Sequence, residues 1–224
     1  MKYDRREPRE PMSVAEIVSA TTRGRLPLHI TAWDGSSVGP ESAPVSLHIA
    51  EPGGLAAFVH PHTHLALIAS IVAGAVTTDD SPAAVVEAVY QLESLFVRST
   101  PVDAIKLTRT FATLGVKRPR GEFATDGPIT GERTIGGTTT AEALVFTPKL
   151  STLIADYERR GERVTDIHYE PDALAIIAER EKTLESEHGT SDRNQLGLRY
   201  RLAVLAHRIT AGELRAYRIE SGIN

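Results

Sequence analysis

The densest group of side chains able to do chemistry is the run His60-Pro61-His62-Thr63-His64. On an extended backbone, alternate residues point to the same side, so these three imidazoles would face one metal ion. A site of the amidohydrolase kind also needs His and Asp ligands from distant strands of a much larger barrel, and no such set follows here. The alternative is a proline-containing corner between two helices, with solvated histidines. We therefore expect no bound metal, and keep His60, His62 and His64 as a remote alternative for a metal-dependent enzyme.

Two further histidines lie on neighbouring strand patterns. His29 alternates with Leu28 and Ile30, and His48 alternates with Leu47 and Ile49, so both occupy the polar phase of a half-buried strand. If the strands pair, the two imidazoles would lie across from each other as a titrating pair. The other interpretation is that both are ordinary exposed positions of a sheet face.

The motifs of the common catalytic and cofactor sites are absent from the sequence. There is no G-x-S-x-G nucleophile elbow, and the chain has 0 Cys, which removes thiol chemistry and thiolate metal sites. No strand pattern runs into a Gly-rich turn, because Ile135-Gly136-Gly137 lies in a polar stretch. We therefore expect no cofactor, no catalytic residue and no enzymatic activity of the chain by itself.

The elements that would position these residues follow from periodicity and capping. Ser13 and Glu16 form a capping box that predicts a helix from Val14 to about Arg23. Asp34-Gly35-Ser36-Ser37 and Gly39-Pro40 predict the turns of an antiparallel pair of strands, 28–32 and 45–49. Helices are predicted at 55–60, 65–72, 83–98 and 102–114, then from Thr147-Pro148 to Gly161, from Pro171 to about His188, and over 192–210. Strands are predicted at 163–169 and, as an edge strand, at 214–219.

The stretch from Lys117 to Thr140 is rich in Gly, Thr and Pro and almost free of apolar periodicity, which indicates a linker. The predicted organisation is a disordered tail at 1–12, an N-terminal domain at 13–118, a linker at 119–143 and a C-terminal lobe at 144–224. The fold class is α+β, with a small N-terminal lobe of helices and antiparallel strands and an α/β C-terminal lobe.

Composition limits the partners. The net charge is −4 and Lys and Arg are spread along the chain, so no nucleic-acid footprint is expected. The longest apolar run, at about 65–76, is too short to span a bilayer. We expect a cytoplasmic protein with peripheral membrane contact at most.

Two segments carry a resemblance to a known family. Leu26 to Ile49 contains A-W-D-G-S-S-V-G-P between two strands, and this stretch resembles the N-terminal domain of actinobacterial cyclopropane fatty acid synthases. The resemblance continues through GLAAFVHPHTHLALIASIVAGAV, Gly54 to Val76. In the C-terminal lobe, VFTPKLSTLIADYERRGERVTDIHYE is similar to a family segment in which Phe and Pro lead into a helix and a Val-x-Asp-(Ile/Val) strand. The ending, YRLAVLAHRITAGELRAYRI, resembles the closing helix and strand of these enzymes.

The resemblance covers both ends of a synthase and omits its methyltransferase core, so the C-terminal lobe resembles the remnant of a methyltransferase fold. It implies a non-catalytic accessory subunit that forms a heteromer with a full-length synthase-type fatty-acyl methyltransferase making cyclopropane or 10-methyl fatty acids. The alternative is a stand-alone protein that binds an acyl chain or phospholipid. The residues expected to contact a partner or lipid are Trp33, Asp34, Phe58, Leu198, Leu202, Leu205 and Ile209. The leucine stripe has two interpretations, since it can face another subunit or the chain's own core.

Overall fold

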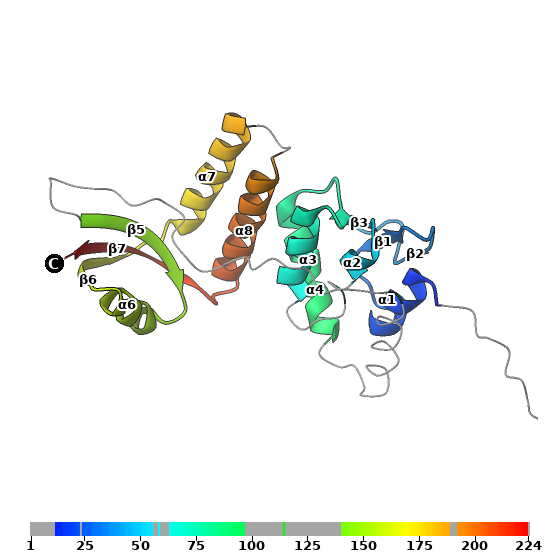
Figure 1. Cartoon of the computed structure of the whole chain (residues 1–224), viewed down its shortest axis with the longest axis horizontal. Coiled ribbons are helices and arrows are strands. Elements are labelled where there is room, and N and C mark those ends of the chain that lie inside the picture. Colours follow the sequence, from blue (N-terminus) through cyan, green and yellow to red (C-terminus); the bar gives the residue numbers. More distant parts are fainter. Residues whose placement is uncertain are drawn as a thin grey trace, which may run out of the picture. The chain divides into compact units, whose positions relative to one another are not determined.

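The computed structural model describes residues 12–22, 24–55, 58, 63–96, 114, 140–188 and 192–223. The chain divides into two compact units, Met1–Glu122 and Phe123–Asn224, and contains both helices and sheets in the α+β manner (Figure 1). The predicted helix at 102–114, apart from Leu114, and the predicted linker up to residue 139 lie outside the described residues, as does the predicted tail apart from Met12. No helix in the described ranges is long and apolar enough to cross a membrane.

The N-terminal unit surrounds a short four-stranded sheet with helices. Its elements are α1 (Val14–Thr22), β1 (His29–Ala32), β2 (Ser37–Val38), β3 (Ser46–Ile49), α2 (Pro52–Leu55), α3 (Thr63–Ala73), β4 (Val76–Thr77) and α4 (Pro82–Phe96). The capping-box prediction for α1 is confirmed, because the Ser13 N–H donates to Glu16 Oε2 at 2.8 Å and the Glu16 N–H donates to Ser13 Oγ at 3.2 Å. Fully buried aliphatic side chains of the sheet and helices form the core, among them Ile17, Ile30, Leu47, Ile49, Leu67, Val85 and Leu92.

The strand order is β2-β1-β3-β4, and the central pair is parallel. The prediction that 28–32 and 45–49 form an antiparallel pair is therefore wrong. The turn at residues 33–36 instead folds β2 back onto β1 in the antiparallel direction, with Ile30 opposite Val38. The chain then returns to the start of β1 before β3 begins, so that His29 lies opposite Ser46. The turn residues were identified correctly, but they serve a hairpin with a two-residue strand that periodicity cannot detect.

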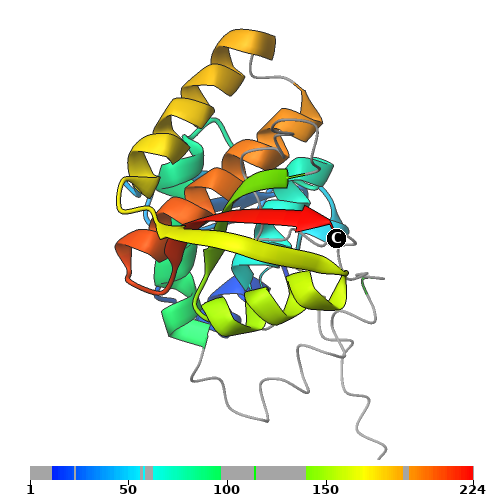
Figure 2. The same ribbon diagram turned by 90° about the vertical axis from the view of Figure 1, so that its left-hand side faces the viewer.

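The C-terminal unit is a three-stranded sheet with helices on both faces (Figure 2). Its elements are β5 (Thr140–Thr147), α6 (Leu150–Arg159), β6 (Glu162–Tyr169), α7 (Ala173–His188), α8 (Arg193–Thr210) and β7 (Arg215–Ile223). Both β5 and β6 pair antiparallel with β7, so they run parallel to each other and are joined through α6 as a β-α-β unit. The predicted start of the lobe at residue 144 is too late, because β5 begins at Thr140 inside the predicted linker.

The last strand, β7, lies in the centre of the order β5-β7-β6 and corrects the prediction of an edge strand. It pairs with β5 over 215–222 and with β6 over 217–223, so that Arg218 lies between Leu144 and His168. Its even-numbered positions face α7 and α8, and its odd-numbered positions face α6, where Ile219 is fully buried. A terminal position in the sequence says nothing about the place of a strand in its sheet, and this explains the error.

Candidate functional site

The turn at residues 33–36, which carries the most specific part of the family resemblance, is built onto the N-terminus of α1. Asp34 Oδ2 accepts the backbone N–H of Val14 at 2.8 Å, and Ser36 Oγ accepts that of Ala15 at 3.0 Å. Asp34 Oδ1 in turn accepts both the N–H and the hydroxyl of Ser36, at 3.0 and 2.6 Å. Since Ser13 Oγ accepts the next amide, that of Glu16, the first three amides of α1 all have side-chain acceptors.

The ionisation of Asp34 follows from these contacts. Burial acts against the charged form and is the largest single influence. The hydrogen bonds from the Ser36 hydroxyl and from the amides of Val14 and Ser36 together outweigh burial and lower the pKa of Asp34 below its usual value. A carboxylate at a helix N-terminus is also favoured by the helix dipole. Both carboxylate oxygens of Asp34 are engaged, so the side chain acts as a cap.

The motif glycines are also structural. Gly35 and Gly39 have φ angles of 79° and 93°, in the left-handed region that side chains rarely adopt. A Cβ at Gly39 would lie 2.2 Å from the carbonyl oxygen of Leu28, so only glycine lets β2 approach the start of β1. The A-W-D-G-S-S-V-G-P run therefore encodes a turn, a close backbone approach and a helix cap.

Of the two aromatic residues expected to contact a partner or lipid, one is half-buried and the other is fully buried. Trp33 follows β1, donates its backbone N–H to the Ile49 carbonyl at 3.0 Å and has a half-buried side chain. Phe58 is 0% exposed. Its ring is part of the core, so Phe58 offers no surface to a ligand in this conformation.

Of the two interpretations of His29 and His48, the one that places them across from each other as a pair is wrong. Because β1 and β3 are parallel, His48 lies opposite Thr31, and its Nδ1 is 2.9 Å from Thr31 Oγ1. His29 Nδ1 is 3.3 Å from the Gly39 carbonyl oxygen, toward β2. The two imidazoles are thus offset by two residues along the sheet and have separate partners.

Of the histidine run, only His64 can be placed, since His60 and His62 lie outside the described residues. His64 is in the first turn of α3, and its ring stacks on Tyr90 of α4 with centroids 5.0 Å apart. The backbone of His64 is therefore helical, whereas a metal site of three alternating imidazoles would require an extended backbone there. Within the described ranges, no three His, Asp or Glu side chains are grouped to hold a metal ion.

The leucine stripe of α8 faces the core of its own unit. Leu202 and Leu205 are fully buried in a cluster with Leu144, Phe146 and Ile177, and Leu198 and Ile209 pack against the same cluster. Of the two interpretations of the stripe, packing within the chain is the one that the structure contains.

An ionic cluster that no sequence pattern indicated spans the C-terminal sheet. Arg218 of β7 donates from Nη1 to Glu142 of β5 at 2.8 Å and from Nε to Glu170, just beyond β6, at 2.7 Å. These hydrogen bonds, first to Glu170 and then to Glu142, raise the pKa of Arg218 against the opposing effect of burial. On the same face, Asp166 and His168 form a more exposed pair at 2.8 Å. The carboxylates come from segments 76 and 48 residues away, so no local spacing signals the cluster.

Comparison with known proteins identifies no family for this chain. No protein-family model matches the chain. A search of curated proteins also returns no match.

Proposed function

We propose that this chain is a non-catalytic accessory subunit that binds a full-length fatty-acyl methyltransferase of the cyclopropane synthase type. The observation that carries the proposal is the structural use of the resembling motif. Asp34, Ser36 and Gly39 cap a helix and allow a close strand approach, and none of them presents a free reactive group. The motif therefore builds a scaffold, and a scaffold without a reactive group of its own is compatible with a binding role.

The C-terminal unit supports the same proposal through its element order. Phe146 and Pro148 lead into α6 and then into β6, which carries Val164-Thr165-Asp166-Ile167, as the resemblance implies. The closing helix and strand correspond to α8 and β7. The parallel relation of β5 and β6 through α6 is the kind of crossover from which methyltransferase-type α/β sheets are built.

Copurification tests the proposal directly. Tagged chain would be co-expressed with a full-length cyclopropane synthase, and in parallel with a methyltransferase that lacks the synthase N-terminal domain. We expect a complex with the first enzyme only, detected by size-exclusion chromatography, and a changed rate of methyl transfer from S-adenosylmethionine to phospholipid acyl chains. If the synthase elutes separately and its rate is unaffected by added chain, the proposal is wrong.

A further inference from the structure

The α7–α8 hairpin has two unlike halves. We name residues 173–180 of α7 and 200–210 of α8 the base, and residues 181–188 and 193–199 the tip; the boundary is the fully buried Tyr200. The base contributes four residues to a buried cluster: Ala173, Ile177, Leu202 and Leu205. The sheet side of this cluster consists of Leu144 and Phe146 of β5, Ala216 of β7 and Leu214, which directly precedes β7. The tip contributes only Leu184, with Leu198 packed against the cluster. In Figures 1 and 2 the last turns of α7 and the first turns of α8 lie away from the sheet of their unit.

Polar groups weaken the packing of the tip. Gln195 is 6% exposed and lies three residues before Leu198 on the same stripe of α8. Neither its Oε1 nor its Nε2 has a hydrogen-bond partner, as judged within the part of the chain that the structure describes. A buried amide without partners costs free energy that an apolar side chain at the same place would not cost.

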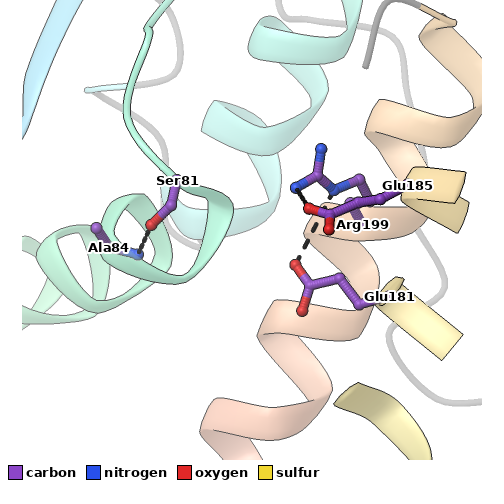
Figure 3. A network of polar contacts seen from close by, with 5 residues as sticks. All are labelled: Ser81, Ala84, Glu181, Glu185 and Arg199. Atoms are coloured by element: carbon purple, nitrogen blue, oxygen red, sulfur yellow. Dashed lines mark hydrogen bonds and ion pairs between the residues drawn. The ribbon is translucent and has the colours of Figure 1, made fainter. Parts of the chain in front are cut away.

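The ion pair of the tip compensates this cost only in part. Arg199 reaches back to α7, where its Nη2 is 2.6 Å from Glu185 Oε1 and its Nε is 4.0 Å from Glu181 Oε1 (Figure 3). The second distance is too long for a hydrogen bond. Among the residues that the structure describes, buried Arg199 Nε has no hydrogen-bond partner, and the same holds for Arg201 Nε at the start of the base. Arg199 is 13% exposed and Glu185 is 51% exposed, so water screens this ion pair from the side of Glu185.

The helix sequence is weak in the same region. Gly197 lies five residues into α8 and disfavours the helical backbone relative to alanine. In α7, Thr183 Oγ1 donates to the Glu179 carbonyl at 2.9 Å and Ser186 Oγ donates to the Thr183 carbonyl at 2.8 Å. Hydroxyl residues that bond back in this way lower helix stability slightly.

From these observations we propose that the tip of the α7–α8 hairpin opens as a separate unit while the base stays packed on the sheet. Opening gives the Gln195 amide access to water and leaves Leu202 and Leu205 buried with Phe146. Local opening of this kind is common where apolar contacts are few and polar groups are poorly paired. The opened tip exposes Leu184 and Leu198 transiently, and the proposal does not depend on the proposed function.

Hydrogen exchange of the full chain tests the proposal. We expect backbone amides at 182–187 and 197–199 to exchange at least ten times faster than those at 176–180 and 203–209. Gln195→Leu removes the unpaired amide and should slow exchange in the tip about tenfold without a comparable change in the base. Equal protection of the two halves, or an equal effect of Gln195→Leu on both, would overturn the proposal.

A matched pair of threonines provides a second test with little risk to folding. Thr183 lies in the tip and Thr210 ends the base, and each hydroxyl donates to the carbonyl four residues before it at 2.9 Å. Thr183→Ala should slow exchange in the tip two- to threefold, whereas Thr210→Ala should leave the tip unchanged. The proposal fails if the two substitutions have the same effect on the tip.

Discussion

Asp34 accepts the backbone N–H of Val14 at 2.8 Å and thereby joins the turn after β1 to a helix that begins 20 residues earlier. The contact fixes α1 against the edge of the sheet. The same turn supplies Ser36 to the next amide, so helix and hairpin support each other.

Removal of this cap should destabilise the N-terminal unit. Asp34→Ala leaves the first amide of α1 without its acceptor, and we expect the free energy of unfolding to fall by about 1–2 kcal/mol. Trp33 is the single tryptophan of the chain and lies next to the substituted residue, so its fluorescence would report unfolding of this unit in denaturant. Asp79→Ala, at an exposed carboxylate, is the control. A loss equal to that of the control would contradict the capping role.

Acid should remove the same contribution. The pKa of Asp34 is lowered in the folded state, so its stabilisation is complete above the unfolded value, about 3.9, and is lost as pH falls through the folded value. Asp34→Asn cannot titrate. The stability difference between the natural chain and Asp34→Asn, measured through Trp33 fluorescence, should therefore be largest at neutral pH and shrink below pH of about 4. A difference that stays constant into acid would show that the charge of Asp34 is unimportant.

The two glycines of the turn should respond unequally to alanine. At Gly39 an added Cβ meets the Leu28 carbonyl oxygen at 2.2 Å, whereas at Gly35 it meets nothing within 4 Å. Both positions have positive φ, which by itself costs an alanine about 1 kcal/mol. We expect Gly35→Ala to lose about that amount and Gly39→Ala at least about 2 kcal/mol, because the backbone must also move. Equal losses in thermal unfolding would argue against the close approach.

Removal of the Arg218 guanidinium should destabilise the C-terminal sheet. Glu142 and Glu170 are only 20% and 18% exposed, so Arg218→Met leaves two mostly buried carboxylates without their cation. We expect the free energy of unfolding of the C-terminal unit to fall by about 1–3 kcal/mol. The loss should be visible as faster hydrogen exchange of the β7 amides. The stability of Arg218→Lys should lie between that of the natural chain and that of Arg218→Met, because an ammonium group keeps the charge but cannot reproduce the fork of the guanidinium. Arg163→Met, at an exposed position of β6 opposite Gly222, is the control. An equal effect of both methionine substitutions would contradict the assignment.

The parts of the fold that local sequence specifies were predicted well. The capping box of Ser13 and Glu16 predicted the start of α1. The helix predicted over 192–210 matches α8, whose N-cap Asp192 accepts the Asn194 N–H through Oδ1 at 3.0 Å. Ser81-Pro82 opens α4 in the same way, with the Ala84 N–H donating to Ser81 Oγ at 3.3 Å. Caps, periodicity and turn glycines act over a few residues, so one segment carries all the information they need.

Tertiary structure decided how these elements pair. The segments around His29 and His48 form strands as expected, but their parallel direction depends on the path of the chain between them, so the interpretation that pairs the two histidines is wrong. The central place of β7 depends on β5 and β6 flanking it, and Arg218 finds Glu142 and Glu170 only in that order. Sequence by itself determined most of the longer helices, the strands around His29 and His48 and the cap of α1, because those preferences are local, but it did not indicate β2, β4 or β5. Strand direction, strand order and the ionic cluster required the folded chain, because they join residues that only packing brings together.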